Sequence, residues 1–538
     1  MPVIKIKGTD IRLNCEQAEN LLTVLLREHI FVENPCSGKG TCGKCRVRLL
    51  GEWENKVSET EEKFLKKEEI KEGIRLACLT DVTDDMEIEL LTQEKAGKVM
   101  TSGYMPDFQK EFRQGFGIAV DIGTTTVVTE LVNMKDGMIL AQDSMINPQK
   151  QFGLDVLTRI TYEYDHPDDG VGKLQKAIVD ALNHMIENMC TKAGVFPENI
   201  AEIDVAANCT MLHMLLGIDA RQIGHAPYQP VFKEAQTIKA QKIGIRAGKE
   251  TILYCLPSVS SYIGADIVAG AYVCGLQKEK ENVLFIDIGT NGEIVLASGG
   301  KLLSCSCAAG PALEGMNITC GMRAADGAIE EVHIEQGGVK VQVIGGESPE
   351  GLCGSGILSV MKELLRTGIV KNTGVFVKKE AIPDSDFRSS LIRLNGTKRE
   401  FIINHDPEIF VTQGDIRQIQ LAKGAILSGF LALLNRAGIS MEELSKVLIA
   451  GQFGAHLPAE SLVGTGILPE FVKDKIIYVG NSSKTGAYMT LMSAKAKREI
   501  EILAEDISYM ELAETENYER LFTESMIFPG KGREKWKR

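Results

Sequence analysis

The segment Gly117–Thr126 reads GIAVDIGTTT, and the segment Val283–Gly292 repeats it as VLFIDIGTNG. Each copy is an apolar run that ends in Asp, continues through Gly and Thr, and enters a second apolar run. This pattern is typical of two strands joined by a tight turn. Two such units in one chain indicate an internal duplication. From Phe116 onward strand patterns alternate with helical ones, which predicts an α/β fold for this part of the chain.

The two turns have the composition of a phosphate-binding site. Gly and Thr supply backbone N–H groups and hydroxyls that donate to phosphate oxygens, and an Asp at the strand end can hold Mg²⁺ through its waters. Two facing turns would grip a triphosphate from both sides, so we expect a nucleoside triphosphate and Mg²⁺, with Asp121 and Asp287 next to the metal. No GxxxxGK(S/T) P-loop occurs. The expected phosphate-binding residues are Asp121, Gly123, Thr124, Thr125, Thr126, Asp287, Gly289, Thr290, Asn291 and Gly292.

At these motifs the chain resembles the superfamily of actin, the heat-shock chaperones and the sugar kinases, over roughly Phe116–Leu503. The resemblance implies a two-lobed ATPase whose lobes are duplicated ribonuclease H-like folds. Pro257–Gly270 and Gly480–Ala487 resemble its two connecting helices. Lys446–Gly454 resembles the adenosine motif, and Gly310–Gly315 lies where the chaperones place a loop near the ribose. The resemblance adds these nucleotide contacts: Gly310, Glu314, Gly451, Gln452 and Gly454.

Two further carboxylates are candidates for catalysis. In sugar kinases of this superfamily an Asp placed like Asp266 takes a proton from the substrate hydroxyl, so the resemblance implies that Asp266 orients or deprotonates the attacking water. A carboxylate that caps a helix is an equal alternative. Glu293 is the second candidate, against the alternative of an exposed strand glutamate. His213 and His456 lie among apolar or Gly residues, so we interpret them as structural.

The cysteines are unevenly distributed. The chain has 13 of them, and Cys36, Cys42 and Cys45 follow the spacing C-x5-C-x2-C, with Cys78 further on. Four thiolates are the ligands of a [2Fe–2S] cluster, and the glycines between them let the loop fold tightly around it. A four-cysteine zinc site is the alternative, although it usually has two C-x2-C pairs. Cys15 lies off the pattern and is not expected to be a ligand.

Two other features of this region matter. The loop also matches GxGxxG at Gly38–Gly43, but no strand precedes it and no helix clearly follows, so we do not interpret it as a dinucleotide site. Around the loop, residues 1–95 predict a small α+β unit with strands at Val3–Lys7 and Arg46–Leu50 and a helix over Ala18–Glu28. This region resembles a β-grasp [2Fe–2S] ferredoxin, with the adrenodoxin spacing of cysteines.

Composition limits the function classes. The chain has 538 residues, 44% hydrophobic and 25% charged, with a net charge of −13. Such acidity argues against a nucleic-acid partner. The N-terminus opens into a strand pattern and has no apolar signal-peptide core. No apolar run is as long as a membrane span, which needs about 18 residues. We therefore expect a cytoplasmic protein that does not cross a membrane. Cysteines in that reducing compartment are not expected to form disulfides.

The predicted organisation has four parts. They are a ferredoxin-like domain at 1–95, a linker at 96–115, an ATPase domain at 116–528 with lobes at about 116–280 and 281–528, and a basic tail at 529–538.

A redox cluster joined to an ATPase resembles the reductive activators of corrinoid proteins. Phe152–Ile160, Asn208–His213 and Gly351–Gly356 carry the likeness further. The resemblance implies transfer of one electron from the cluster to the Co(II) corrinoid of a partner methyl-transfer protein, regenerating Co(I), with ATP hydrolysis as the driving reaction. It implies a low-potential electron donor, and it leaves a homodimer open. No corrinoid-binding DxHxxG pattern occurs, so the corrinoid belongs to the partner.

Two alternatives and one departure accompany this interpretation. The alternatives are a small-molecule kinase with an appended iron–sulfur sensor, and a chaperone-like nucleotide switch with a structural cluster. The departure concerns an extra domain that some family members carry between linker and ATPase, for which the linker at 96–115 leaves no room.

Overall fold

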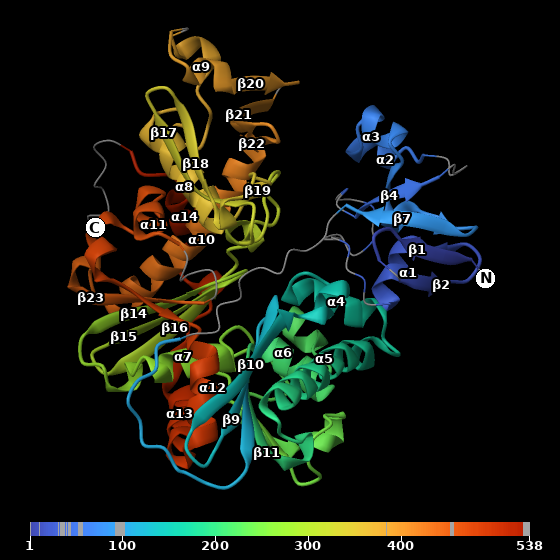
Figure 1. Cartoon of the computed structure of the whole chain (residues 1–538). Helices are drawn as coiled ribbons and strands as arrows, with labels where there is room; N and C mark the ends of the chain where they lie inside the picture. The colour runs from blue at the N-terminus through green and yellow to red at the C-terminus, as the bar shows by residue number, and fades with distance from the viewer. Residues whose placement is uncertain are drawn as a thin grey trace. The chain divides into compact units, whose positions relative to one another are not determined.

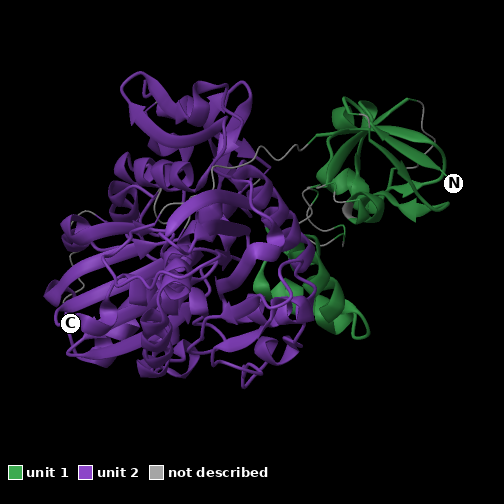
Figure 2. Ribbon diagram, turned by 60° about the horizontal axis from the view of Figure 1, so that its bottom comes forward, with its two compact units in different colours: residues 1–96, 147–178 green, residues 97–146, 179–538 purple. Residues whose placement is uncertain are grey.

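The chain forms two compact units, shown in green and purple in Figure 2. The first contains Met1–Ala96 and Asn147–Ile178, and the second contains Gly97–Ile146 and Val179–Arg538. The computed structural model describes residues 2–9, 11–28, 30, 32, 38, 40, 43, 45–51, 57–91, 103–383, 385–396, 398–451 and 457–530. The grouping differs from the predicted boundary at residue 95, because it adds a second, later segment to the first unit.

The N-terminal part is built on a five-stranded sheet in the order β2-β1-β7-β4-β5. Strand β1 pairs antiparallel with β2 and parallel with β7, and β4 pairs antiparallel with β5 and β7. The strands are β1 (Val3–Ile6), β2 (Arg12–Asn14), β4 (Arg46–Leu50), β5 (Ile74–Leu76) and β7 (Met86–Leu90). Alternate residues point into one core, because side chains on a strand alternate between its faces. This is the predicted ferredoxin-like fold.

Helix α1 (Leu21–Arg27) covers this core with Leu21, Val24 and Leu25. It begins three residues later than the predicted start at Ala18. Ala18 has a left-handed φ of 60°, and the next two residues form strand β3 (Glu19–Asn20), which pairs with β6 (Asp81–Val82). Helices α2 (Glu61–Phe64) and α3 (Lys67–Lys71) follow β4.

The later segment of the first unit is held by buried polar contacts. It contains α4 (Val156–Asp165) and the start of α5 (Gly170–Ala193). Asp155 caps α4 by accepting from the Thr158 N–H at 2.7 Å. The Arg159 side chain is fully buried, and its Nε donates to the Gly153 carbonyl at 2.9 Å.

The second unit contains two six-stranded sheets that share one topology over five strands (Figure 1). Their orders are β10-β9-β8-β11-β13-β12 and β24-β23-β14-β15-β16-β25. In each, an antiparallel hairpin (β8–β9 or β14–β15) lies beside a parallel strand (β11 or β23). The sixth strands, β12 and β25, lie at opposite edges of this common arrangement. The predicted duplication is therefore present in the fold.

The strands of these sheets have the following bounds. The first has β8 (Phe116–Ile122), β9 (Thr126–Asn133), β10 (Met138–Ile146), β11 (Ile200–Ala207), β12 (Gln236–Lys239) and β13 (Ile252–Cys255). The second has β14 (Asn282–Ile288), β15 (Gly292–Ser298), β16 (Lys301–Cys307), β23 (Leu444–Ala450), β24 (Ile476–Gly480) and β25 (Ile507–Tyr509).

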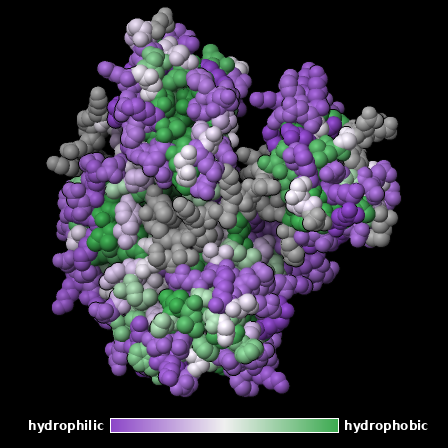
Figure 3. Space-filling model, in the orientation of Figure 1, coloured by the Kyte–Doolittle hydropathy of each residue, from purple (hydrophilic) through white to green (hydrophobic). Residues whose placement is uncertain are grey.

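The remaining elements surround these sheets. They are α6 (Cys209–Leu216), α7 (Ala265–Val273), β17 (Ala328–Glu335), β18 (Gly338–Val343), β19 (Gly351–Leu352), α8 (Gly354–Arg366), α9 (Arg388–Leu391), β20 (Ile392–Asn395), β21 (Lys398–His405), β22 (Glu408–Thr412), α10 (Gln413–Ala437), α11 (Ala459–Gly464), α12 (Ser482–Met492), α13 (Ala494–Asp506) and α14 (Tyr518–Ser525). On the face shown in Figure 3 hydrophilic side chains predominate. No helix in the described part of the chain has the length and apolarity needed to cross a membrane.

Helices α12 and α13 return to the first lobe, although the predicted second lobe was continuous over 281–528. Every residue of α12 is buried, and the helix packs on β8, β11 and α7. Gly486 makes this approach possible, because a Cβ there would lie 2.5 Å from the Ala269 Cβ. The packing partners of this segment therefore come from the predicted first lobe, although the segment follows the second lobe in sequence.

Part of the predicted linker is also ordered on the second unit. Residues 103–115 contain no helix or strand, but Gly103 forms a bridge with Gly480. The Tyr104 N–H donates to the Val479 carbonyl at 2.9 Å, and the Glu111 N–H donates to the Met492 carbonyl at 2.7 Å. The earlier part of the linker lies outside the described residues.

Candidate functional site

The two repeated turns are tight hairpins. The Gly123 N–H donates to the Thr126 carbonyl at 2.8 Å, and the Gly289 N–H donates to the Asn291 carbonyl at 2.9 Å. A Cβ at Gly123 would lie 2.9 Å from the Thr126 carbonyl oxygen, so only glycine fits this turn. Both turns therefore present short side chains and backbone N–H groups at the ends of their central strands.

Glu314 connects the two turns. It ends the short helix Pro311–Glu314 and is 2% exposed. Its Oε1 accepts from the Thr290 hydroxyl at 2.5 Å, and its Oε2 accepts from the Thr125 hydroxyl at 3.3 Å. The turns thus face each other, as the duplication predicted. The resemblance had placed Glu314 near the ribose, whereas its carboxylate lies at the phosphate turns.

Four carboxylates besides Glu314 gather at this place: Asp121 of β8, Asp266 of α7, Asp287 of β14 and Glu293 of β15. Burial, and then repulsion from Asp287 and Asp121, raises the pKa of Asp266 to about 8. Burial, and then repulsion from Asp121 and Glu314, raises the pKa of Asp287 to about 7. Burial, and then Asp266 and Asp287, raises the pKa of Glu293 well above its ordinary value. These carboxylates are therefore close enough to repel one another.

Glu293 and Asp266, the two catalytic candidates, both lie in this carboxylate cluster. Glu293 pairs directly with Asp287 across the β14–β15 hairpin and is half-buried, so it is not an exposed strand glutamate. Asp266 Oδ1 accepts from the Ile267 N–H at 2.9 Å. The N-cap of α7 is Gly264 and no side chain caps the helix, so Asp266 lies in the first turn without the capping contact of the alternative. The same side chain faces the other carboxylates.

Asp121 and Asp287 have different surroundings. Asp121 accepts from Asn481 Nδ2 at 2.8 Å and from the Ser483 hydroxyl at 2.7 Å, so the start of α12 engages both of its oxygens. Burial raises the pKa of Asp121 in spite of these bonds. Asp287 lies against Gly451, where a Cβ would collide with its Oδ1. Gly451 has a φ of 88° and ends β23, as the adenosine motif predicts; Gln452 and Gly454 lie outside the described residues.

The cluster fits a hydrated Mg²⁺ better than a directly coordinated ion. In the described residues no group of three or more His, Cys, Asp or Glu side chains is arranged to hold a metal ion. Mg²⁺ usually keeps several waters and shares its shell with substrate phosphates. A ring of carboxylates with raised pKa values around two phosphate turns suits such an ion, because its charge would offset their repulsion.

His213 is structural, as predicted. The imidazole is buried and stacks on Phe232 at 4.3 Å between ring centroids. Its Nδ1 lies 2.8 Å from the Cys209 carbonyl, and its Nε2 accepts from the Val231 N–H at 3.1 Å. Burial lowers its pKa, which keeps the ring neutral. His456 lies outside the described residues.

The cysteine loop is described at two of its four predicted ligands. Cys45 and Cys78 place their sulfur atoms 3.3 Å apart, and this contact lowers the pKa of Cys45 to about 7. Cys36 and Cys42 lie outside the described residues. Cys15 is buried, its thiol donates to the Pro2 carbonyl at 3.4 Å, and burial raises its pKa. Two adjacent sulfurs, one with a thiolate-favouring pKa, fit the predicted cluster.

Glycines and one arginine shape this loop. Gly38, Gly40 and Gly43 all have left-handed φ values, and a Cβ at Gly43 would lie 2.6 Å from the Phe64 Cβ. Strand β4, not a helix, follows the loop, so the GxGxxG match does not form a dinucleotide turn. Arg46 donates to the Gly43 carbonyl at 3.1 Å and to Glu69 at 2.7 Å.

Several residues that position the candidate site residues were not predicted from the sequence. Asn481, Ser483 and Arg46 position candidate site residues, and Asn208 donates to the Thr124 hydroxyl at 3.0 Å. Asn481 and Asn208 both cap helices, so an Asn before a helical pattern was the available signal. Nothing in the sequence distinguished Arg46 from its neighbours.

The fold and the two sites together define an iron–sulfur protein that carries an ATPase unit of the actin and sugar-kinase type. Family models match three consecutive parts of the chain: the 2Fe-2S iron-sulfur cluster binding domain at 4–83, the RACo middle region at 116–279, and the C-terminal domain of RACo, the ASKHA domain, at 281–538. The corrinoid activation enzyme RamQ of Eubacterium limosum is 33% identical over 431 residues, which cover 79% of this chain and 72% of RamQ. The chain therefore belongs to the RACo family of reductive activators of corrinoid proteins.

Two more similarities extend over most of the chain. A [Co(II) methylated amine-specific corrinoid protein] reductase of Methanosarcina barkeri is 25% identical over 400 residues, 68% of each protein. A solved reductive activator for a corrinoid, iron-sulfur protein is 30% identical with a TM-score of 0.68, and the match covers 99% of both chains. The expectation that this chain lacks a middle domain needs correction: the RACo middle region is present at 116–279 and forms the first lobe.

Proposed function

We propose that this protein transfers one electron from a [2Fe–2S] cluster to the Co(II) corrinoid of a partner methyl-transfer protein, regenerating Co(I), and that ATP hydrolysis drives the transfer. One observation carries the proposal: a single chain holds adjacent cysteine sulfurs, Cys45 and Cys78, and two phosphate turns joined by Glu314. A low-potential electron donor and a cytoplasmic location belong to the same proposal.

The cysteine loop serves the electron-transfer half. Cys36, Cys42, Cys45 and Cys78 would hold the cluster, which supplies storage for a single electron. Burial keeps water from the Cys45 sulfur, and the backbone N–H groups that donate to it would tune the potential. Arg46 fixes the loop to α2 and α3 by donating to Phe64 and Glu69, so its geometry is held during electron transfer.

The carboxylate cluster serves the ATPase half. The threonines and glycines of both turns would bind the phosphates, and Asp121 and Asp287 would hold the waters of Mg²⁺. Asp266 or Glu293 would accept a proton from the attacking water while its oxygen bonds to the γ-phosphorus and the bond to ADP breaks. A carboxylate with a pKa near 8 is a strong enough base for this role once a cation has removed its proton.

The link between the halves passes through α12. Hydrolysis cannot change the number of electrons; it can only favour one conformation or complex over another. Asn481 joins Asp121 at the first phosphate turn, and Gly103 packs so closely on Asn481 that a Cβ would collide with the Asn481 carbonyl. The segment that begins at Gly103 and connects to the cluster domain therefore packs on the residue that contacts the first phosphate turn. We propose that nucleotide exchange shifts this segment.

An anaerobic reconstitution tests the proposal. Protein with its cluster restored is mixed with a low-potential reductant and a Co(II) corrinoid protein, and the Co(I) absorption is followed with and without ATP. We expect Co(I) only when ATP is present. Cys45→Ser and Cys42→Ser should abolish reduction and leave nucleotide binding intact. Asp287→Ala should weaken nucleotide binding and abolish Co(I) formation, while the cluster itself still accepts an electron from the reductant. Cys15→Ala is the matched control, since Cys15 is buried in the same domain but off the pattern. ATP-independent reduction, or full activity of Cys45→Ser, would refute the proposal.

A further inference from the structure

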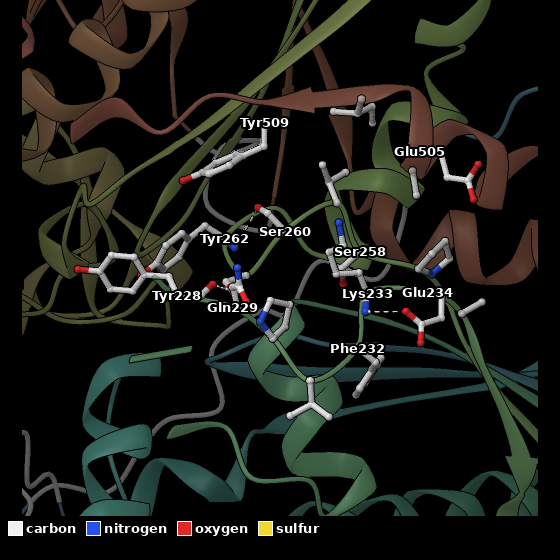
Figure 4. A pocket seen from close by; sticks show the side chains of 18 of the residues that line it. Tyr228, Gln229, Phe232, Lys233, Glu234, Ser258, Ser260, Tyr262, Glu505 and Tyr509 are labelled. Carbon is white, nitrogen blue, oxygen red and sulfur yellow. Dashed lines mark hydrogen bonds between the residues drawn. The ribbon is translucent and has the colours of Figure 1, made fainter. Parts of the chain in front are cut away.

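A pocket of about 990 Å³ lies in the second unit, apart from the carboxylate cluster (Figure 4). Its walls come from the loop 227–235, the loop 257–262 that leads into α7, and α13 with the residues that follow it. The two loops are joined where the Ser258 N–H donates to the Lys233 carbonyl at 2.8 Å. The pocket is therefore bounded by fixed backbone on several sides.

Aromatic rings line one part of the pocket. Tyr228 and Tyr262 lie with their ring centroids 5.6 Å apart and tilted by 57°. Tyr509 of β25 lines the same pocket, and Figure 4 shows all three rings toward one end of it. Ring faces carry negative electrostatic potential and attract cations.

Carboxylates line the rest. Glu234, Glu501, Glu505 and Glu511 face the pocket, against one cation, Lys233. Figure 4 shows Glu234 and Glu505 toward the end opposite the tyrosines. The Tyr254 hydroxyl donates to Glu501 at 2.9 Å, and the Tyr509 hydroxyl donates to Glu511 at 3.1 Å. In the described part of the chain none of the four glutamates forms an ion pair with Lys or Arg.

This charge arrangement is unfavourable in the free protein. Glu501 and Glu505 stand at i and i+4 on α13, and like charges at that spacing destabilise a helix. Two cations of α13 precede Glu501 by one turn. Lys497 is already engaged by Glu202 and Asp204, and Arg498 forms no ion pair with these glutamates in the described residues. A ligand that brings positive charge would relieve this repulsion.

We propose that this pocket binds a basic segment of the partner protein through its Lys and Arg side chains. A segment is favoured over a small organic cation because the carboxylates come from a loop, a helix and a turn, and a single cation cannot reach them all. The volume is also at the upper end of small-molecule pockets. The inference rests on the proposed function only in naming the partner as the corrinoid protein.

The location gives such binding a consequence for the ATPase. Residues 257–262 run directly into α7, which carries Asp266 in its first turn. A segment seated against Tyr262 would therefore contact the element that positions a catalytic candidate. Docking of the partner and binding of the nucleotide would then change each other's affinity by the same factor.

The test uses the full-length protein and a short fluorescent peptide of alternating Lys and Arg, with binding followed by anisotropy. Glu505→Gln and Tyr228→Leu should each weaken binding by about two- to fivefold, because a partly exposed ion pair or cation–π contact contributes about that much to affinity. Asp506→Asn is the matched control: it removes one negative charge from the same helix outside the pocket, and should leave affinity within the error. Tyr228→Phe keeps the ring and should bind normally.

Two outcomes would overturn the inference. One is equal weakening by Asp506→Asn and Glu505→Gln, which means general attraction to an acidic surface. The other is displacement of the peptide by free arginine or tetramethylammonium at similar concentrations, which means a small-cation site. The peptide assay involves no cobalt, so a failure of the proposed function would appear in the Co(I) assay and leave this measurement unchanged.

Discussion

Binding of Mg²⁺-nucleotide should release protons, because the carboxylates that receive it hold protons in the free protein. With pKa values of about 8 for Asp266 and about 7 for Asp287, roughly nine-tenths of the first and half of the second are protonated at pH 7. A cation beside them favours the ionised forms. We therefore expect about 1.4 protons to be released per nucleotide bound at pH 7, falling toward zero at pH 9.

Titration calorimetry in buffers of different ionisation enthalpy measures this number directly. Asp266→Asn should remove most of one proton from the release. Asp204→Asn is the control, because Asp204 is also buried with a pKa of about 7, but its neighbours are Lys497 and Glu202. A release that is absent at pH 7, or that Asp204→Asn lowers as much as Asp266→Asn, would refute the assignment of the cluster to the nucleotide.

The same shifts fix the sign of the pH dependence of stability. A carboxyl whose pKa is raised from 3.8 to about 8 contributes stability that is complete below its unfolded value near 4 and is lost as pH rises through 8. At about 1.4 kcal/mol per unit, that contribution is several kcal/mol. Nucleotide binds more tightly as pH rises over this range, so the increase in Tm caused by Mg²⁺-nucleotide should be larger at pH 8 than at pH 6.

Three further changes test the packing. Thr290→Val should destabilise the free protein by about 1–3 kcal/mol in urea unfolding, and by more than Thr125→Val. The reason is that the Thr290 hydroxyl donates to Glu314 at 2.5 Å and the Thr125 hydroxyl at 3.3 Å. The reverse order would contradict the role of Glu314 in joining the two turns. Gly486→Val should cost about 1–3 kcal/mol because α12 loses its close approach to α7, whereas Gly172→Ala, with open space around it, should not lower Tm. Gly103→Ala should displace the segment beside the nucleotide and uncouple ATP hydrolysis from Co(I) formation, and unchanged coupling would count against the proposed route.

Local patterns predicted the elements whose identity depends on nearby residues. Strand β4 has its predicted bounds, Arg46–Leu50, because an alternating strand between a cysteine loop and a charged stretch has few alternatives. The hairpins were predicted from the repeated Asp-Ile-Gly-Thr, since that composition requires a tight turn after an apolar strand. Helix α1 begins later than its pattern indicated, because Glu19 pairs with β6, and this contact with a distant strand is not visible in the local pattern.

The remaining features depend on contacts between distant parts of the chain. Periodicity places α12 as a helix but does not say which sheet covers its buried surface. The role of Glu314 likewise depends on two turns that meet only in the folded unit. Asn481 and Ser483 read as helix-start residues, and only the fold shows that their side chains reach Asp121.

The burial of α12 has a consequence for synthesis of the protein. Helix α12, which covers the first sheet, begins at Ser482, long after the last strand of that sheet ends at Cys255, and all of its residues are buried. While the ribosome is still making the second lobe, the first sheet has a bare face, whereas the ferredoxin-like part is complete and has its own core. The nascent chain can therefore receive its iron before it can bind ATP, and a chain cut before Ser482 should retain the visible spectrum of the cluster but have lost nucleotide affinity.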